Sequence, residues 1–531
     1  MINKNLVSIS VFAVAYFSLQ SCENNTNEQE KPNILFCIAD DASFPHMSAY
    51  GTSWVNTPGF DQVAEQGLLF TKAYTPNAKS APSRACILTG RNSWQLEEAG
   101  NHSPIFPLKF KSFAEALSEN GYHVGYTAKG WAPGIALNKD GKKRDLLVKN
   151  YDEHTTTPPA KFIHKGDYAA NLAAFLDDNN NEKPFFFWYG SREPHRAYEF
   201  NVSVAKGGKK ISDIDSAFAM WPNVDSVKID MLDYAFEIEY FDKHLQLMLT
   251  ELEERGLLEN TIVVVTADNG MPFPRIKGQE YEMSNHLPLA ISWPNGIKNP
   301  GRVINDYVNF IDFAPTFLEL AGISEDQSAM QSIEGKSLTD IFYSKKEGIV
   351  NEERNHVIIG KERHDVGRPM NHGYPIRGIV KADFLYIMNF EPERWPAGNP
   401  ETGYLNCDGS PTKTLILNTY GTENHYFWQW NMGKRPKEEL YNVKNDPLCM
   451  NNLANNGEYT SLKEEMYNQM VEKLKAQKDP RMFGNGAIFE NYPYSAPDYN
   501  TYYEKYMAGE LGQGGWVNAS DYRAEQGVDL E

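Results

Sequence analysis

The sequence has few cysteines, and they lack the spacing of a metal or redox motif. Five cysteines occur among 531 residues, and no two of them form a CxxC pair. This absence excludes the common cysteine-based zinc and redox motifs. Cys37 and Cys86 lie in apolar stretches and are expected to be small buried side chains. A disulfide between Cys407 and Cys449 is left open.

Positive charge is also scarce. The chain has 51 Lys and Arg residues against 70 Asp and Glu residues, which gives a formal net charge of −19. A general nucleic-acid binder needs a basic stripe, so we expect no nucleic-acid partner. An anionic substrate is still compatible with this charge, because a metal ion and a few cations can dominate one pocket.

Long hydrophobic runs and internal repeats are missing as well. The apolar segment Leu6 to Leu19 is too short for a comfortable transmembrane helix, and it follows the positive residue Lys4. This pattern predicts a signal peptide. Its end, Leu19-Gln20-Ser21-Cys22, looks like a bacterial lipobox, in which Cys22 becomes the lipid-bearing first residue of the mature protein. The alternative is an ordinary cleaved signal peptide.

The lipobox interpretation has consequences for location and organisation. Residues 1–22 are expected to be a lipoprotein signal peptide, and the polar, acidic residues 23–31 a flexible tether. We therefore expect an exported bacterial lipoprotein, held in the periplasm or at the cell surface by a membrane anchor at Cys22.

What the chain does contain is an alternation of buried strands and helices. Continuous apolar runs suit strands buried on both faces, as in a parallel sheet. They occur at Asn33 to Ala39, Tyr122 to Thr127, Pro184 to Tyr189, Thr261 to Ala267 and Pro288 to Trp293. Helical patterns lie between them, for example at Ser112 to Asn120 and Met231 to Arg255. The alternation predicts an α/β fold with a mostly parallel central sheet flanked by helices.

The pattern changes after about residue 373. Gly378 to Asn389 is typical of a strand, a turn and a second strand, Glu438 to Asn442 of a further strand, and Ser461 to Gln477 of a helix. We expect a main domain over residues 32–373 and a C-terminal subdomain over 374–531, with a small antiparallel sheet, one helix and a wrapping tail. No function is assigned to that tail.

Two pairs of oxygen-bearing side chains follow predicted strands. Asp40-Asp41 comes after the first run and Asp268-Asn269 after a later one, with Gly190-Ser191 ending a third. Ligands of such sheets bind beyond the carboxyl ends of the strands, so these residues can converge. Oxygen-only ligands favour a hard divalent cation, Ca²⁺ or, less favoured, Mg²⁺, over zinc. The alternative for each pair is a helix cap or an Asx-turn.

Ser80 is the most informative residue. It opens the run Ser80-Ala81-Pro82-Ser83-Arg84-Ala85-Cys86-Ile87-Leu88-Thr89-Gly90. On its own the run predicts a helix start with Ser80 as its cap and a proline in the first turn. Beside a metal site, the same helix N-terminus would face an anion pocket.

Three further residues complete the predicted pocket. Lys129 follows the second strand, His195 follows the third, and Lys277 lies eight residues beyond Asn269. Each has an ordinary alternative as a solvated or loop side chain. Together with the metal, Arg84 and the helix start, they suit a tetrahedral oxyanion ester.

The run Ser-x-Pro-Ser-Arg-x-x-x-x-Thr-Gly from Ser80 to Gly90, preceded by Asp40-Asp41 and followed by Asp268-Asn269-Gly270, resembles the type I sulfatases. The resemblance covers nearly the whole mature chain and implies an alkaline-phosphatase-like fold. It also implies that Ser80 is oxidised to formylglycine, in the Ser form by a radical S-adenosylmethionine maturation enzyme.

The resemblance carries roles over to matching positions. Ser80 and four oxygen ligands would surround calcium: Asp40, Asp41, Asp268 and Asn269. Arg84, Lys129 and Lys277 would hold the formylglycine and the sulfate. His195 would protonate the leaving group. The hydrated formylglycine would attack sulfur with one hydroxyl, and the other would collapse to the aldehyde and expel sulfate.

Further motifs resemble the heparan N-sulfatase (sulfamidase) branch. They include Pro194-His195-Arg196 and Asp268 to Pro274. One position departs from the family, which usually has a histidine two residues after the lysine that matches Lys129, whereas this chain has Trp131. That histidine helps to eliminate sulfate. His102 is a candidate replacement, and Trp131 a candidate part of a sugar-stacking wall.

The resemblance predicts a sulfatase acting on a sulfated polysaccharide or its oligosaccharides, in polysaccharide degradation. The substrate is left open between a marine or algal O-sulfated glycan, of ulvan or carrageenan type, and an N- or O-sulfated glycosaminoglycan of heparan type. Two alternatives remain: a phosphomonoester or phosphonate hydrolase of the same fold, and a non-catalytic glycan-binding lipoprotein. Candidate sugar-stacking residues elsewhere are Trp395, Trp428 and Trp430.

Overall fold

A seven-stranded sheet forms the centre of the computed structural model, which describes residues 31–180 and 182–523. The strand order is β10-β2-β9-β8-β1-β7-β5. These strands are β1 (Asn33–Ala39), β2 (Gly67–Phe70), β5 (His123–Ala128), β7 (Phe185–Gly190), β8 (Thr261–Ala267), β9 (Leu289–Ser292) and β10 (Arg302–Ile304). Strands β8, β1, β7 and β5 run parallel, and β9 is antiparallel to both of its neighbours.

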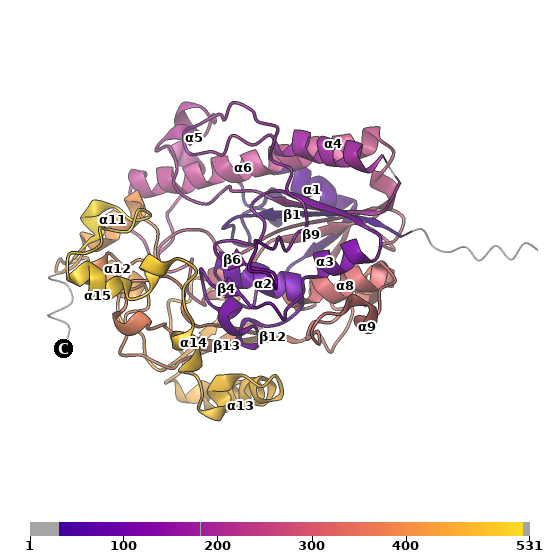
Figure 1. Cartoon of the computed structure of the whole chain (residues 1–531). Coiled ribbons are helices and arrows are strands. Elements are labelled where there is room, and N and C mark those ends of the chain that lie inside the picture. The colour runs from indigo at the N-terminus through magenta and orange to yellow at the C-terminus, as the bar shows by residue number, and fades with distance from the viewer. Residues whose placement is uncertain (1–30, 181, 524–531) are drawn as a thin grey trace, which may run out of the picture. The chain divides into compact units, whose positions relative to one another are not determined.

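Both faces of this sheet are covered by helices (Figure 1). One face packs against α1 (Pro58–Glu65), α4 (Tyr168–Asn179) and the long α6 (Asp225–Glu254). The other packs against α2 (Ser80–Thr89), α3 (Phe113–Glu119) and α8 (Phe313–Leu320). The expected α/β class with a mostly parallel, two-sided sheet is therefore confirmed.

The alternation of side chains along β1 explains why the strand is apolar throughout. Leu35 and Cys37 point into the core under α6, whereas Ile34, Phe36 and Ile38 point into the core under α2 and α8. Successive side chains of a strand point to opposite faces, so a strand covered on both sides needs apolar residues at every position. This is the pattern that the sequence shows.

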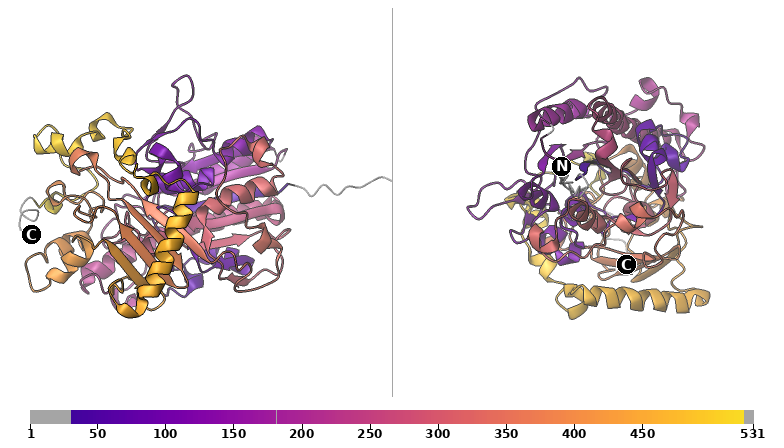
Figure 2. Two further views of the ribbon diagram at one scale, coloured as in Figure 1. Left: turned by 90° about the horizontal axis from the view of Figure 1, so that it is seen from below. Right: turned by 90° about the vertical axis from the view of Figure 1, so that its right-hand side faces the viewer.

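A second sheet has four antiparallel strands in the order β12-β13-β14-β15. They are β12 (His356–Lys361), β13 (Ile376–Lys381), β14 (Phe384–Asn389) and β15 (Glu438–Asn442). Helix α13 (Thr460–Ala476) lies across this sheet, as Figure 2 shows, and buries Met466, Met470 and Leu474 against it. The smaller antiparallel sheet with one helix is confirmed as expected.

Shorter elements connect these layers. The strands are β3 (Ala73–Tyr74), β4 (Ile105–Phe106), β6 (Ile135–Ala136) and β11 (Val308–Asn309). The helices are α5 (Val202–Ala205), α7 (Glu282–Asn285), α9 (Glu325–Ser328), α10 (Thr339–Tyr343), α11 (Pro411–Leu417), α12 (His425–Asn431), α14 (Ile488–Asn491) and α15 (Tyr502–Met507).

The four cysteines in the described part of the chain are all free and buried. The disulfide between Cys407 and Cys449, left open above, is not formed. Burial raises the pKa of the thiol of Cys37 and of Cys86, in keeping with their expected place in the apolar core. Residues 31–180 and 182–523 contain no helix with the length and hydropathy of a membrane span. The predicted signal peptide, lipobox and tether up to residue 30 lie outside the described residues.

Candidate active site

Four loops meet where the parallel strands end. Asp40 follows β1, Lys129 follows β5, Ser191 follows β7 and Asp268 follows β8. Backbone hydrogen bonds tie these ends together, since the Lys129 N–H donates to the carbonyl of Gly190 at 2.8 Å and the Asp268 N–H to that of Ala39 at 3.1 Å. The convergence that the sequence predicts is therefore present in the fold.

Gly190 is required where β5 and β7 come together. A Cβ at this position would lie 1.8 Å from the carbonyl oxygen of Lys129, far inside any real contact. Alanine there would push the Lys129 backbone away from the sheet.

We expect Gly190→Ala to lower the free energy of unfolding by about 1–3 kcal/mol. It should also lower catalytic activity, because the backbone that must move carries Lys129. Thermal unfolding and an assay of the activity that the sequence resemblance predicts, measured side by side, test both effects. Gly457→Ala is the matched control, since nothing lies within 4 Å of a Cβ built there. Equal melting temperatures for the two variants would contradict the expectation.

Helix α2 places Ser80 at the floor of the site. All ten of its residues are buried, and its C-terminus is closed by Gly90 at φ 66°, whose N–H donates to the carbonyl of Cys86. Ser80 opens the helix as expected, but its hydroxyl does not cap it: the N-cap is Lys79, with no side-chain cap bond. The predicted capping role of Ser80 is wrong, because its hydroxyl contacts the side chains of Asp40, Asn269 and Lys129 instead.

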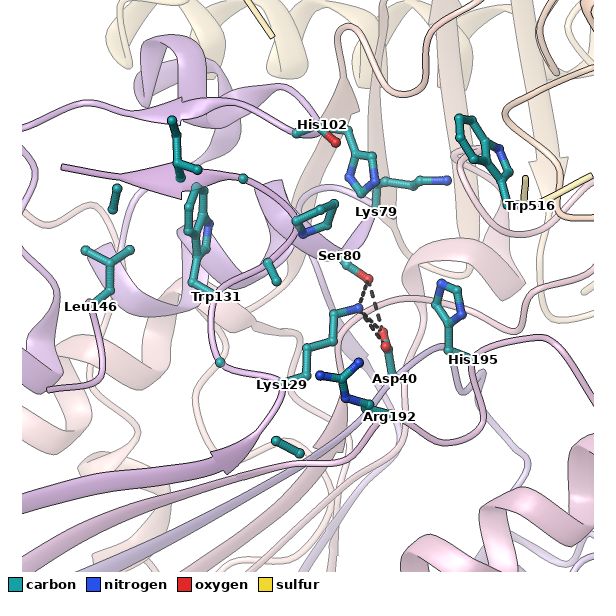
Figure 3. Close-up of a pocket in the computed structure, with 18 of the residues that line it drawn as sticks. Asp40, Lys79, Ser80, His102, Lys129, Trp131, Leu146, Arg192, His195 and Trp516 are labelled. Carbon is teal, nitrogen blue, oxygen red and sulfur yellow. Dashed lines mark hydrogen bonds and ion pairs between the residues drawn. The ribbon is translucent and has the colours of Figure 1, made fainter. Parts of the chain in front are cut away.

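The Ser80 hydroxyl lies among three of the predicted residues. Its Oγ donates to Asp40 Oδ1 at 3.1 Å and lies 3.4 Å from Asn269 Oδ1. Lys129 Nζ donates to the same Oγ at 2.9 Å. Figure 3 shows Ser80, Lys129 and Asp40 joined in this way at the centre of the cavity.

The acidic side chains form one buried group. Oxygens of Asp40, Asp41 and Asp268 lie within 4.8 Å of one another, and each residue is at most 2 % exposed. The amide of Asn269 donates to Asp41 Oδ1 at 2.7 Å, which leaves its own oxygen facing Ser80. Such a set of oxygen donors fits a hard divalent cation.

Cationic side chains surround this acidic group. Lys129 Nζ lies 2.6 Å from Asp40, Arg84 Nε 2.8 Å from Asp268, and Lys277 Nζ 2.6 Å from Asp41. Burial acts to raise the pKa of Asp40, but Lys129 and the other nearby cations outweigh burial and lower it. The carboxylate of Asp40 is thus held in its charged form.

Arg84 is held by several hydrogen bonds, but one of its guanidinium nitrogens has no hydrogen-bond partner in the described part of the chain. Its Nη1 donates to the carbonyls of Lys129 at 2.7 Å and Gly130 at 3.0 Å. Its Nη2 is buried and has no hydrogen-bond partner among the described residues, with Asp40 Oδ1 3.7 Å away. A buried guanidinium donor without an acceptor favours an anionic ligand at this point.

His195 stands at the side of the site with one ring nitrogen anchored. Its Nδ1 lies 2.6 Å from the carbonyl of Arg196, so Nδ1 carries a proton, and Nε2 lies 3.9 Å from Asp41 Oδ2. The side chain is 37 % exposed. Nε2 is therefore placed to exchange a proton with a molecule in the cavity.

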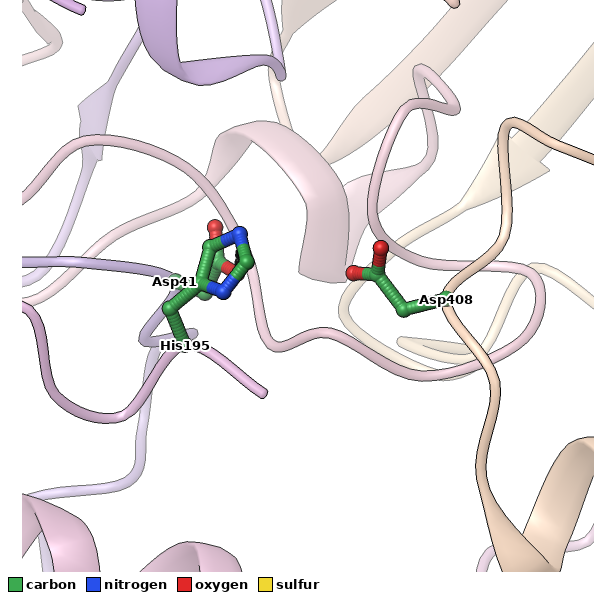
Figure 4. Close-up of side chains that lie close together, drawn as sticks. All are labelled: Asp41, His195 and Asp408. Carbon is green, nitrogen blue, oxygen red and sulfur yellow. Dashed lines mark ion pairs between the residues drawn. The ribbon is translucent and has the colours of Figure 1, made fainter. Parts of the chain in front are cut away.

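Asp408 is a site residue that sequence reasoning missed. It accepts a hydrogen bond from Lys277 Nζ at 2.8 Å and forms a second group of possible metal ligands with Asp41 and His195. Figure 4 shows Asp408 approaching the other two from a separate part of the chain. Burial acts to lower the pKa of Lys277, but Asp408 and Asp41 outweigh it and raise that pKa. No local motif marks Asp408.

Beside Ser80 lies a further group, in which His102 was a candidate from the sequence and Lys79 and Asp365 were missed. Lys79 Nζ contacts Asp365 at 2.6 Å, and His102 Nε2 lies 3.6 Å from the other oxygen of Asp365. Burial, reinforced by Lys79, lowers the pKa of His102 well below its usual range, so this imidazole is neutral. His102, the candidate replacement for the family histidine, thus lies in the cavity wall next to the Ser80 helix.

The cavity above Ser80 has a volume of about 960 Å³. Asp40, Ser80 and Lys129 lie at its floor, and the residues 130–137 form much of one wall. Trp131 belongs to that wall and donates its Nε1–H to the carbonyl of Ala81 at 3.0 Å. The candidate role of Trp131 in a sugar-binding wall is therefore compatible with its place.

The other predicted stacking residues do not reach this cavity. Trp395, Trp428 and Trp430 are absent from its walls, and Trp428 is fully buried beside Tyr420. Their candidate role is wrong for this site, because Trp395 and Trp428 pack in the core and Trp430 packs, half-buried, against Tyr426 and Phe427. Trp516 of the C-terminal tail lines the cavity instead.

Comparison with known proteins gives a consistent result. The family model described as Sulfatase matches residues 32–323. An ulvan-active sulfatase of Formosa agariphila is 28 % identical over 469 residues, which cover 86 % of this chain and 82 % of the relative. The human N-sulphoglucosamine sulphohydrolase is 24 % identical, with 86 % of this chain and 93 % of the relative covered.

A solved structure has the same fold. It holds a protein in complex with its substrate, D-glucosamine-2-N,6-O-disulfate, and superposes with a TM-score of 0.59 at 20 % identity. The superposition covers 85 % of this chain and 99 % of that one.

Proposed function

This chain belongs to the sulfatase family, and from that membership we propose that it removes sulfate groups from a sulfated polysaccharide or its oligosaccharides through a formylglycine formed from Ser80. The family match and the sulfatase relatives make it a sulfuric ester hydrolase, that is, an enzyme. They argue against both alternatives, a phosphate-ester hydrolase and a non-catalytic binding protein.

One observation carries the proposal. Ser80 lies at the start of a fully buried helix, with its hydroxyl between Asp40, Asn269 and Lys129 at the floor of the cavity. A surface or capping serine needs none of these partners. In the formylglycine form, the hydrated aldehyde would supply one hydroxyl to attack sulfur and a second whose collapse releases sulfate.

We propose that the cation is calcium and that Asp40, Asp41, Asp268 and Asn269 would hold it next to Ser80. The donors are all oxygens, and the orphaned Arg84 Nη2 beside them favours an anion close to the cation. Calcium would supply positive charge that neutralises the sulfate oxygens and the attacking hydroxyl. Mg²⁺, which prefers a rigid octahedral set with several waters, is the less favoured choice.

The protein's own cations would do the remaining positioning. Arg84 is fixed by two backbone carbonyls and by Asp268. Its Nη2 can therefore bind the sulfate without a further loss of side-chain entropy. Lys129 is anchored on Asp40 and Lys277 on Asp41, which holds their ammonium groups beside the proposed sulfate position. These three residues would bind sulfate and stabilise the charge that develops on it.

His195 would give a proton to the departing sugar oxygen or nitrogen. Its Nδ1 is occupied by the Arg196 carbonyl, so Nε2 is the nitrogen that faces the cavity. We expect His195→Ala to lower kcat/KM for a sugar sulfate by about 10²–10⁴-fold.

The same variant should lose much less activity on 4-nitrophenyl sulfate, because a good leaving group needs little protonation. Paired kinetics on the two substrates provide the check. An equal loss of kcat/KM on both substrates would show that His195 is not the acid that protonates the leaving group.

The substrate choice is between two classes. The similarity to an ulvan-active sulfatase supports an algal O-sulfated glycan, and the similarity to an N-sulphoglucosamine sulphohydrolase supports a heparan-type glycan. A panel of defined sulfated oligosaccharides of both kinds, with released sulfate measured, tests the proposal. Release from one class identifies the substrate, and no release from any member of the panel would contradict the proposed function.

We also propose export as a lipoprotein anchored at Cys22 and maturation of Ser80 by a radical S-adenosylmethionine enzyme. Both rest on the sequence, on the lipobox and on the serine form of the motif. Labelling of cells with a radioactive fatty acid, compared between the natural protein and Cys22→Ala, tests the anchor. Label on both proteins or on neither would refute it.

A further inference from the structure

The C-terminal tail, residues 477–523 after helix α13, contributes to the wall of the catalytic cavity. Tyr499 and Trp516 line the same cavity as Ser80, although they belong to the segment that follows the last long helix, α13. No motif in the tail suggests this position, and the tail has no role in the chemistry described above.

Trp516 is fixed to the loop that carries Asp408. Its indole N–H donates to the carbonyl of Leu405 at 2.8 Å, and its own carbonyl accepts the N–H of Gly409 at 2.8 Å. The tail is therefore joined to both sides of Asp408, which in turn holds Lys277.

Trp131 and Trp516 lie on opposite sides of Ser80 in the view of Figure 3. Each indole N–H is already satisfied by a backbone carbonyl, of Ala81 and of Leu405 respectively. Both side chains are only partly buried, so part of each aromatic surface is open to the cavity. Fixed rings of this kind bind apolar surfaces with little loss of entropy.

Polar groups that suit sugar hydroxyls lie close to Ser80 as well. The carboxylate of Asp365 is 12 % exposed at its contact with Lys79, and Asp365, Lys79 and His102 all line the cavity. Sugar-binding sites combine such donors and acceptors with an aromatic surface that covers the C–H face of the ring. The volume of about 960 Å³ is at the upper end for a small-molecule site, so it leaves room beyond one sulfated ring.

We propose that Trp516 is the platform of a second sugar subsite, which binds the ring adjacent to the one that carries the cleaved sulfate. This inference rests on the proposed function and extends it: the enzyme recognises at least a disaccharide. Trp516 is a binding residue here, not a catalytic one.

Trp516 also packs within the tail, so a structural role has to be separated from a binding role. Its ring lies 6.3 Å from that of Tyr499. Tyr506 belongs to the same hydrophobic cluster, where it contacts Tyr502 and Tyr522, but it does not line the cavity. Tyr506→Ala therefore loosens the tail without removing the proposed platform.

The test compares Trp516→Ala, Trp516→Phe and Tyr506→Ala with the natural protein. The probes are the sulfated monosaccharide, disaccharide and tetrasaccharide of the glycan from which the natural protein releases sulfate fastest. We expect Trp516→Ala to reduce the preference in kcat/KM for the tetrasaccharide over the monosaccharide by about tenfold. Trp516→Phe should keep most of that preference, and Tyr506→Ala should keep all of it.

A binding measurement avoids any dependence on turnover. In the Ser80→Ala background, isothermal titration with the same tetrasaccharide should show about tenfold weaker affinity when Trp516→Ala is added. An unchanged preference in Trp516→Ala, or the same loss in Tyr506→Ala, would overturn the second subsite. A natural protein without sulfate release on the whole panel would instead overturn the proposed function.

Discussion

Replacing Ser80 by alanine is expected to give a folded protein that releases no sulfate. The substitution removes one oxygen at a position that is 2 % exposed, and Lys129 keeps both oxygens of Asp40 as partners. The backbone of α2 does not depend on this side chain, because the helix has no side-chain cap. We therefore expect a melting temperature close to that of the natural protein.

The loss of activity should be much larger than any loss of stability. Without the hydroxyl no formylglycine can form, so the attacking oxygen of the proposed mechanism is lost. We expect kcat/KM to fall by at least roughly 10⁴-fold. Sulfate release and thermal unfolding on the same preparation provide the measurement.

Thr89→Val is the matched control for this experiment. Thr89 is buried in the same helix, and its hydroxyl donates only to the carbonyl of Ala85. Removing that hydroxyl should leave turnover per folded molecule unchanged. Substantial turnover by Ser80→Ala would show that Ser80 is not the source of the nucleophile.

The second large effect is expected for Asp268→Asn. Asp268 is fully buried; its Oδ1 accepts the N–H of Asp41 at 3.0 Å and its Oδ2 the Nε of Arg84 at 2.8 Å. The amide keeps the shape but leaves the buried Arg84 without its nearest counter-ion, with only Asp40 remaining at 3.7 Å. Breaking a buried pair in this way costs about 3–5 kcal/mol.

The same substitution should weaken the metal site and the reaction. One ligand charge is lost, so calcium affinity should fall by at least about tenfold, since ligand charge sets the affinity of such sites. Turnover should fall by at least roughly 10³-fold, because the metal and the aim of Arg84 are both affected. Excess calcium should restore only part of the activity. Calorimetric titration with calcium and kinetics at several calcium concentrations measure both effects.

Asp306→Asn is the control that separates the loss of stability from the loss of calcium affinity. Asp306 is equally buried and accepts two backbone N–H groups, of Val350 and Asn351, but does not line the cavity. This control should lose stability and keep its calcium affinity. If Asp268→Asn bound calcium as tightly as the natural protein, Asp268 would not be a metal ligand.

Much of the fold could be predicted because burial on both faces leaves a clear pattern in the sequence. The runs Asn33 to Ala39 and Thr261 to Ala267 coincide with β1 and β8. Periodicity says nothing about direction, so the antiparallel orientation of β9 could not be predicted. The short strands β2 and β10, which extend the sheet beyond β9, gave no comparable run.

The site residues also fall into those that the sequence could predict and those that it could not. Asp40, Lys129 and Asp268 could be found because each directly follows a buried strand, and topology brings strand ends together. Asp408 and Trp516 reach the site from loops, and their positions are set by long-range contacts such as that between Trp516 and Leu405. Such contacts leave no periodic or local pattern in the chain. The expected helix cap at Ser80 failed for a related reason, since the side chains that contact its hydroxyl, those of Asp40, Lys129 and Asn269, are distant in sequence.

The most direct test of the central claim is peptide mass spectrometry of Ser80 in active protein. The protein should be purified after production together with its maturation enzyme, and sulfate release should be measured on the same preparation. The peptide that contains Ser80 should be lighter by two hydrogen atoms, as oxidation of serine to formylglycine requires, and the modified fraction should rise in proportion to the activity. A fully active preparation in which every Ser80 is unmodified serine would contradict the mechanism.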